Sequence, residues 1–208
     1  MDFPGFFAAA PTITLHDPLA EFLGASKGGV MTYGYADAVK LAGHSCPTVA
    51  GAYLMVRRGL AYLYGDELPE RGGIEVYLRD GREQGTTGVI ATVAMLITGA
   101  APETGFGGLG TGGRFSRRGL LQFDTPIDGL LAMRRRDTGR GVVLDLDLAK
   151  VPSDPTMGPL FVKAMAGQTD EDEQSRFAEL FQGRAARMLL EHANDSNLIQ
   201  ACDWEAVA

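Results

Sequence analysis

One long apolar helix with a well-marked start constrains the fold of this sequence more than any other feature. Pro47 suits the first position of a helix, because its missing N–H would have no partner there in any case. From Val49 to Leu63, apolar residues recur at helical spacing, and the pattern ends at Gly65. The sequence therefore predicts a helix over residues 47–64 whose apolar stripe must pack against the rest of the chain.

The elements expected around this helix come in mixed order. Further helices are predicted over residues 18–23, 37–41, 86–98, 155–166 and 170–192. Strands are predicted over residues 73–79, 119–123, 129–135 and 141–146, with hairpin-turn residues at 137–140 between the last two. This order predicts the α+β class, with a mixed or antiparallel sheet packed with helices, rather than a regular alternation of strands and helices.

Length and composition fit one domain. The chain has 208 residues, of which 45% are hydrophobic and 22% are charged, close to the usual values of globular proteins. The sequence shows no internal repeat and no long linker. We therefore expect a single domain over residues 1–208, with a core at about 15–192 and a tail at 193–208.

Charge and cysteine content exclude several classes of protein. The formal net charge of −7 argues against a broad nucleic-acid-binding surface, which needs a positive field. No apolar run approaches the ~20 residues of a membrane-spanning helix, and the apolar start of the chain lacks the basic residues of a signal peptide. Cys46 and Cys202 are too few for a disulfide framework or a four-cysteine zinc module, although one bridge between them is allowed. A cytoplasmic protein with reduced cysteines is expected.

The motif Gly-His-Ser-Cys-Pro at residues 43–47 carries the chemistry. Pro47 places Cys46 at the start of the predicted helix, where unpaired N–H groups and the helix dipole stabilise a thiolate. His44 lies two residues earlier on extended chain, so its side chain and that of Cys46 project to the same side. Such a pair can bind zinc or a similar metal, or act as nucleophile and base. The alternative is structural, with Cys46 as a small core residue and His44 as a helix cap.

A catalytic zinc site needs more than these two ligands, because it normally takes three protein ligands and a water. His16 is the best third candidate, although its place just before a predicted helix fits a capping role equally well. The remaining histidine, His192, falls on a charged helix, and Cys202 falls in the expected tail. The predicted metal ligands are therefore His16, His44 and Cys46.

Residues 35–47 resemble a segment found in the FmdE-like family, which is named after a component of formylmethanofuran dehydrogenase. Members of that family carry a Gly-His-x-Cys-Pro motif at the start of a long helix rich in Gly, Ala and Tyr, and the Gly-Ala-Tyr run at residues 51–53 continues that pattern. Farther along, residues 83–87 and the Ile-Thr-Gly run at 97–99 resemble the family's acidic, cysteine-containing turn and the apolar helix that ends in Thr-Gly. The resemblance covers about residues 15–192.

The resemblance implies an α+β core, a homodimer, and a metal or thiol site built around His44 and Cys46. This sequence departs from the family at three places. Ala42 stands where many members have a second histidine, the cysteine of the second motif is absent near Glu83 and Thr87, and no C-terminal zinc finger with paired Cys-x-x-Cys is present. The chain therefore resembles a subgroup without the finger. The family's name links it to molybdenum and tungsten enzymes, so an accessory role beside such an oxidoreductase is one expectation, while methanofuran chemistry is not transferred.

A glycine-rich loop is expected at residues 105–119. Residues 105–110 match the pattern G-x-G-x-x-G, but they follow a helix rather than a strand, so they do not mark a dinucleotide-binding fold. The free amides of the loop, with Arg114, Arg117 and Arg118, could hold an anionic group of a ligand. The alternative is a surface loop with solvated arginines.

The predicted ligand site has further candidate residues. Glu83 and Thr87, near the start of an apolar helix, could place a carboxylate and a hydroxyl in a cleft facing Cys46, although helix capping explains them as well. Tyr35 could line the same cleft or belong to the core. The predicted ligand-binding residues are Tyr35, Glu83, Thr87 and Arg114.

We therefore expect a cytoplasmic homodimer that binds a divalent metal ion, zinc first, and a small, anionic ligand. Cys46 and His44 are the candidate catalytic residues, and a bound metal would polarise a carbonyl or activate water. The sequence leaves open whether the protein is an enzyme. Two alternatives remain: a metal-free thiol enzyme or redox protein that uses Cys46 with His44, and a non-catalytic binding or assembly module.

Overall fold

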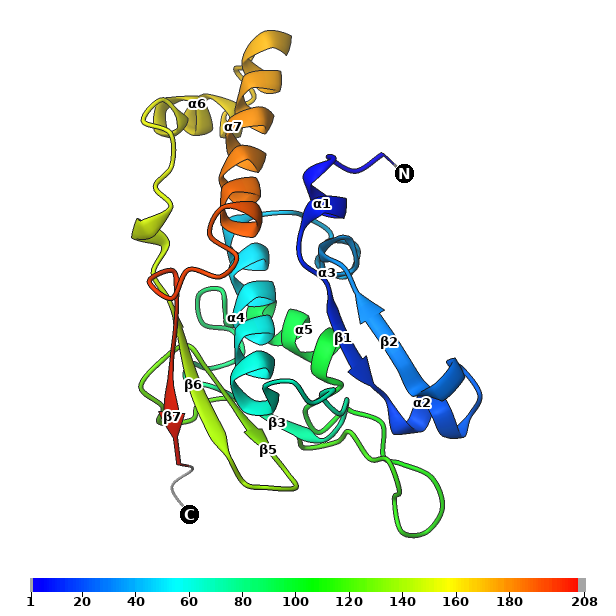
Figure 1. Cartoon of the computed structure of the whole chain (residues 1–208). Coiled ribbons are helices and arrows are strands. Elements are labelled where there is room, and N and C mark those ends of the chain that lie inside the picture. The colour runs from blue at the N-terminus through cyan, green and yellow to red at the C-terminus, as the bar shows by residue number, and fades with distance from the viewer. Residues whose placement is uncertain (1, 206–208) are drawn as a thin grey trace.

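The helix predicted to start at Pro47 forms the axis of the fold. In the computed structural model, which describes residues 2–205, it is α4 (Pro47–Tyr64), and most of its length is buried (Figure 1). Gly51 lies where a strand comes close, because a Cβ at this position would lie 2.4 Å from a methyl carbon of Leu146. The glycine therefore lets the helix backbone approach the sheet.

A five-stranded mixed sheet covers one side of α4. Its strands lie in the order β4 (Leu121–Gln122), β3 (Ile74–Leu78), β5 (Leu131–Arg135), β6 (Gly141–Leu146) and β7 (Ile199–Trp204). β3 and β4 are parallel, and every other neighbouring pair is antiparallel. The strands β5, β6 and β7 pack against α4, so the main core lies between this sheet and the central helix.

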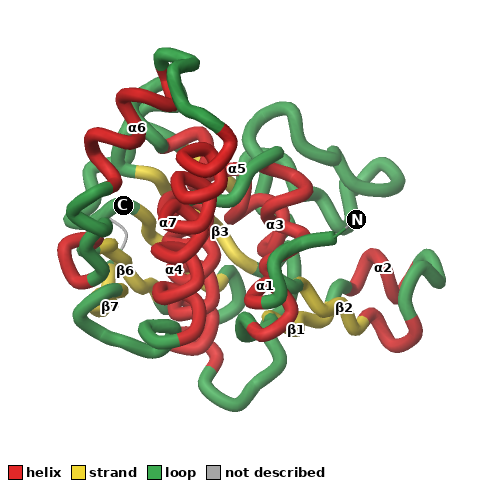
Figure 2. Tube along the Cα trace, turned by 90° about the horizontal axis from the view of Figure 1, so that it is seen from above, coloured by secondary structure: helices red, strands yellow, loops and turns green. Residues whose placement is uncertain are grey.

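A smaller, two-stranded sheet lies on the other side of the central helix (Figure 2). β1 (Ile13–His16) pairs antiparallel with β2 (Val30–Tyr33). Between them the chain forms α2 (Pro18–Phe22) and a short 3₁₀ helix, η1 (Lys27–Gly29). Asp17 and Pro18 begin α2 as the sequence predicts, because the Asp17 carboxylate accepts hydrogen bonds from the N–H groups that open the helix.

Three further helices complete the body of the molecule. α1 (Phe6–Ala9) precedes the small sheet, α3 (Tyr35–Ala42) follows it, and α5 (Thr87–Thr98) packs against α3 and α4. Figure 1 shows α4 and α5 between the two sheets, and α3 beyond the end of the small sheet. This arrangement places the loop from α3 to α4, which carries residues 43–46, at one end of the helix layer.

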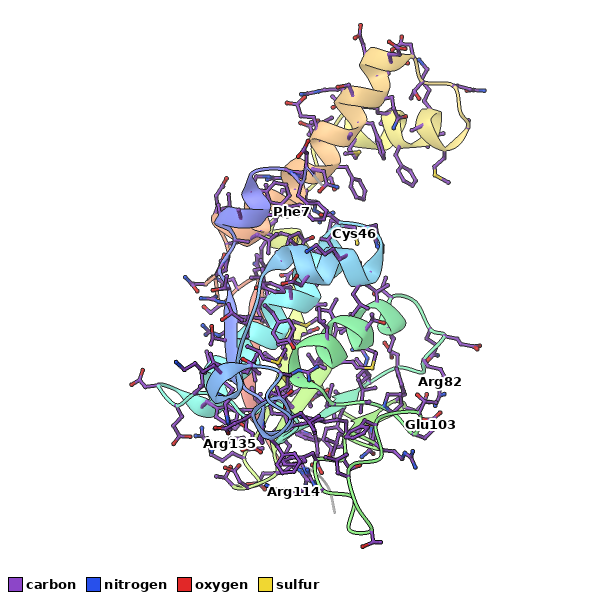
Figure 3. All side chains as sticks on the ribbon, turned by 90° about the vertical axis from the view of Figure 1, so that its right-hand side faces the viewer. Phe7, Cys46, Arg82, Glu103, Arg114 and Arg135 are labelled. Carbon is purple, nitrogen blue, oxygen red and sulfur yellow. The ribbon has the colours of Figure 1, made fainter. Side chains whose placement is uncertain are left out.

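The C-terminal helices form an arm that projects from the body. η2 (Leu148–Lys150) follows β6 and leads to α6 (Met157–Met165) and α7 (Glu171–Leu190). α7 buries side chains only near its end, where it packs against α4, and α6 buries none. The arm, α6 with the first turns of α7, therefore stands clear of the core (Figures 1 and 3).

A buried carboxylate joins three distant parts of the chain. Asp17 is only 3% exposed, and besides capping α2 it accepts hydrogen bonds from Arg71 at 2.9 Å and from Arg117 at 2.7 Å. Arg117 is 6% exposed. Two guanidinium groups thus share one carboxylate inside the protein, a pairing that the sequence pattern does not predict.

The structure confirms the α+β class and the predicted helices and strands, with ends shifted by a few residues. The expectation of a tail at 193–208 is wrong for most of that segment, because it contains β7, which pairs with the whole of β6. Leu198 and Ile199 are buried at the start of β7, and residues 206–208 of the segment lie outside the described residues. Within residues 2–205, none of the helices combines the length and apolar character needed to cross a membrane.

Candidate functional site

Cys46 begins the central helix, as Pro47 predicts. Its backbone is extended, with φ −151° and ψ 169°, and its sulfur accepts a hydrogen bond from the N–H of Val49 at 3.5 Å. The side chain is half-buried rather than enclosed in the core. The start of the helix therefore supplies a backbone N–H that points at the sulfur of Cys46.

His44 lies on the exposed loop between α3 and α4. Its Nδ1 is 2.9 Å from the carbonyl oxygen of Ala42. A carbonyl oxygen can only accept, so Nδ1 must carry the proton, and a neutral ring then keeps the lone pair on Nε2. The loop therefore presents His44 with Nε2 free to bind a metal or to accept a proton.

Ser45 holds this loop in place through two hydrogen bonds. Its Oγ is 2.9 Å from the phenol oxygen of Tyr35, and its carbonyl oxygen accepts a hydrogen bond from Gln182 Nε2 at 3.1 Å. Tyr35 is fully buried, and burial raises the pKa of its phenol to about 12, so the phenol stays neutral at physiological pH. Tyr35, a predicted ligand-binding residue, thus lies behind the loop as a buried support.

The arm borders the start of α4. A small pocket of about 60 Å³ lies between Pro47, Phe161 of α6 and Phe181 of α7. Gln182 belongs to this border, and its Oε1 is buried without a hydrogen-bond partner among residues 2–205. Nothing in the sequence pattern indicates these neighbours, because α7 has the charge pattern of a solvated helix and lies far from Cys46 along the chain.

The structure does not bring His16 to the other predicted metal ligands. His16 pairs with Val30 at the end of β1 that lies away from α3, and its Nε2 is 2.9 Å from a carboxylate oxygen of Glu21. Across residues 2–205, no group of three His, Cys, Asp or Glu side chains gathers in a way that could hold a metal ion. Of the predicted ligands, only His44 and Cys46 share one segment.

The remaining predicted ligand-binding residues lie elsewhere. Thr87 is buried at the first position of α5, and Glu83 is exposed in the preceding turn. None of the hydrogen bonds within the described part of the chain joins either residue to residues 43–46. Arg114 lies over the rings of Phe115 and Phe22, with its guanidinium carbon 4.3 Å and 5.1 Å from the ring centres. Figure 3 shows Arg114 and Cys46 toward opposite ends of the molecule.

The other cysteine and histidine lie apart from this loop. Cys202 is exposed on β7, where it pairs with Val143. His192 follows α7, and its Nδ1 is 3.0 Å from a carboxylate oxygen of Asp195. Both residues therefore serve as internal controls for experiments on Cys46 and His44.

Comparison with known proteins gives only low similarity, and only to solved structures. No family model and no curated protein matches the chain. Among solved structures, the chain is similar to a tungsten formylmethanofuran dehydrogenase FmdE-like protein from Syntrophus aciditrophicus, determined at 1.90 Å resolution. The two share 16% sequence identity and a TM-score of 0.43 over 84% of this chain and 74% of that chain. Because both values are low, the function proposed below is inferred from this chain's own residues.

Proposed function

We propose that this protein binds one divalent metal ion per chain through His44 Nε2 and Cys46 Sγ, and that this ion is zinc rather than another divalent metal. The observation that carries the proposal is the hydrogen bond from His44 Nδ1 to the carbonyl oxygen of Ala42, which leaves Nε2 as the ligand atom. A thiolate sulfur and an imidazole nitrogen are the ligands that zinc prefers. The helix start supports the proposal further, because it places the half-buried Cys46 side chain directly beside the exposed loop that carries His44.

The donor set describes an open site. This chain supplies two ligands at this loop, whereas zinc takes four, so the other positions are left for water or a small molecule. His44 is exposed, which gives such a molecule access. When bound, the ion would supply Lewis acidity toward an oxygen of that molecule. The chain's own residues hold the two ligands in place. Tyr35 and Gln182 form hydrogen bonds with Ser45, which lies between His44 and Cys46 in the sequence.

Elemental analysis of untagged protein purified without chelator tests this site. We expect about one metal ion per wild-type chain and loss of that ion in Cys46→Ala and in His44→Ala, because each variant leaves a single ligand. The matched controls Cys202→Ala and His192→Ala should keep the wild-type metal content. His16→Ala should keep it too, since His16 is bonded to Glu21.

Two outcomes would contradict the proposal. One is wild-type protein without stoichiometric metal that also fails to take up added zinc in equilibrium dialysis. The other is a Cys46→Ala variant that keeps its metal. Loss of the metal in His16→Ala would instead return His16 to the ligand set and require a different conformation of β1.

A metal-free thiol site is the second candidate function. It is favoured by the position of Cys46 at the start of α4, where Sγ accepts a hydrogen bond from the N–H of Val49 at 3.5 Å and needs no metal as a partner. If this function is correct, chelator-treated protein should react with iodoacetamide at Cys46 faster than at Cys202, although Cys202 is the more exposed thiol. Mass spectrometry of the alkylated peptides measures both rates in one sample. Slower reaction at Cys46 would rule this candidate out.

A further inference from the structure

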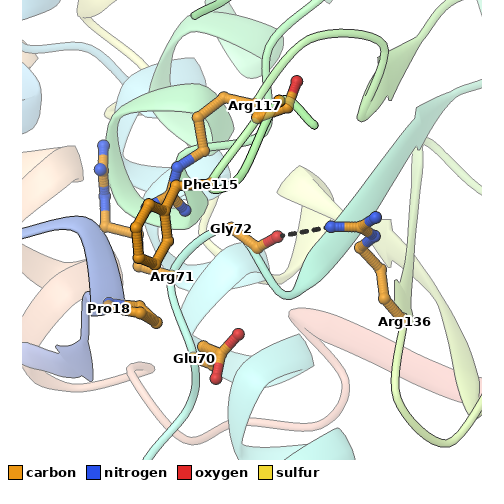
Figure 4. A pocket seen from close by; sticks show the side chains of 9 residues that line it. Pro18, Glu70, Arg71, Gly72, Phe115, Arg117 and Arg136 are labelled. Carbon is orange, nitrogen blue, oxygen red and sulfur yellow. Dashed lines mark hydrogen bonds between the residues drawn. The ribbon is translucent and has the colours of Figure 1, made fainter. Parts of the chain in front are cut away.

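A second pocket lies far from the Cys46 loop, where the glycine-rich loop meets α2 and the chain that leads into β3. Its volume is about 320 Å³, and Figure 4 shows its lining. Three arginines, Arg71, Arg117 and Arg136, take part in that lining, together with the carboxylate of Glu70 and the ring of Phe115. A concentration of guanidinium groups in one pocket is unusual for a chain of net charge −7.

Arg117 is buried in this pocket with a donor to spare. Its Nη2 binds Asp17, but its Nη1 is buried and has no hydrogen-bond partner within residues 2–205. The guanidinium fits because residue 72 is a glycine: a Cβ on Gly72 would lie 1.5 Å from Nη1. A buried N–H without an acceptor costs free energy, so this arrangement calls for an acceptor that the chain itself does not provide.

The charges around Gly72 do not balance. Arg117 lies against Gly72, and Arg136 Nη1 donates to the Gly72 carbonyl oxygen at 3.3 Å, so two guanidinium groups meet at one residue (Figure 4). Arg117 shares its partner Asp17 with Arg71, which leaves one positive charge of that buried group uncompensated. Three guanidinium groups therefore face the two carboxylates of Asp17 and Glu70, an excess of one positive charge.

One wall of the pocket is apolar. Phe115 has φ +65°, in the left-handed region that bulky residues rarely adopt. Arg114 lies over the Phe115 ring, with its guanidinium carbon 4.3 Å from the ring centre. The loop thus holds an aromatic ring beside the arginines, where it can cover the apolar part of a bound molecule.

We propose that this pocket binds the anionic group of a small molecule, a carboxylate or a phosphate, between Arg117 and Arg136 with Phe115 as its apolar wall. A guanidinium group presents parallel N–H donors that match the oxygens of either anion. The anion would accept from the unpaired Arg117 Nη1 and neutralise the excess charge. This site is separate from the His44–Cys46 site and does not depend on a metal.

Calorimetric titration of chelator-treated, full-length protein with inorganic phosphate, and separately with malonate, tests the proposal. We expect saturable binding of at least one anion with a dissociation constant of about 1 mM or lower. Arg136→Gln removes an exposed arginine at the pocket and should weaken binding about tenfold. The matched control Arg82→Gln, which removes an exposed arginine paired with Glu103, should bind as tightly as wild type.

A second variant tests the buried arginine. Arg117→Lys keeps a charge next to Asp17 but removes the unpaired nitrogen. Anion binding should therefore be lost while thermal unfolding stays cooperative. If this variant does not fold, the result for Arg136→Gln decides the test. Tighter binding of phosphate than of malonate, or the reverse, identifies the anion. Cys46→Ala should bind the anion normally, which separates this site from the metal site.

The proposal fails if neither anion binds saturably. It also fails if Arg136→Gln and Arg82→Gln weaken binding to the same degree, because the anion would then respond only to overall charge.

Discussion

Replacing Asp17 by asparagine is expected to lower the free energy of unfolding by about 3–5 kcal/mol. Asparagine keeps the helix cap and nearly the same shape, so the loss comes from the contacts with the arginines. The negative charge is removed, and an amide nitrogen that can only donate replaces Oδ2, the acceptor of Arg71 Nη1. Without the carboxylate, the buried guanidinium of Arg117 and the half-buried guanidinium of Arg71 lose the counter-charge that they share. Urea unfolding at pH 7 measures the difference. Asp147→Asn is the matched control, because Asp147 caps η2 on the surface and should cost less than about 1 kcal/mol.

The same residue sets a pH dependence. Burial raises the pKa of the Asp17 carboxyl, but the hydrogen bond from Arg71, the N–H of Ala20 and the charge of Arg117 outweigh it and hold the pKa below its usual 3.8. The unfolded chain therefore binds the proton more readily than the folded chain. The contribution of Asp17 is fully present above about pH 4 and is lost as the pH falls through the folded pKa. Wild type and Asp17→Asn should converge in stability in strong acid, and a constant difference would contradict this assignment.

Ending the chain at Asn197 is expected to abolish cooperative folding. The truncation removes β7, which pairs with β6 from Leu146↔Ile199 to Gly141↔Trp204. It also removes the buried side chains of Leu198 and Ile199, each worth about 1.5–3 kcal/mol. Together with the lost strand pairing, this loss is comparable to the whole stability of a domain, about 5–15 kcal/mol.

Circular dichroism during heating, together with the yield of soluble protein, measures this effect. The matched control is Cys202→Ala, which changes an exposed side chain on the same strand and should melt like wild type. A truncated chain that unfolds cooperatively at the wild-type temperature would show that β7 is dispensable.

The sequence predicts this fold well where the signals are local. Pro47 marks the start of α4, the turn residues at 137–140 mark the β5–β6 hairpin, and acidic residues mark the start of α7. It misses β1, β2 and β7, which are four, four and six residues long. Length is not the reason, because the predicted β6 also has six residues. β7 lacks a hairpin turn to mark it, since it pairs with a strand that lies far back in the chain.

In the candidate site, too, local features could be predicted from the sequence and long-range contacts could not. The position of Cys46 at the helix start follows from its neighbour Pro47 and needs no tertiary information. The bond from Gln182 to Ser45 spans 137 residues, and that from Arg117 to Asp17 spans 100, so only the folded chain reveals them. The prediction that His16 lies near Cys46 is wrong for a related reason. The sequence shows that a third histidine is present, but the pairing of β1 with β2 determines where it lies.

The arm makes the local stability of this molecule differ between its helices. α6 buries no side chain, and Val162 and Met165 are 68% and 73% exposed, so opening this helix costs little more than its contacts with α7. Its amide hydrogens should exchange with deuterium through local opening, orders of magnitude faster than those of α4, which exchange only when the whole domain unfolds. Mass spectrometry of deuterated peptides compares the two helices directly. Equal protection of α6 and α4 would mean that another molecule covers the apolar face of the arm in solution.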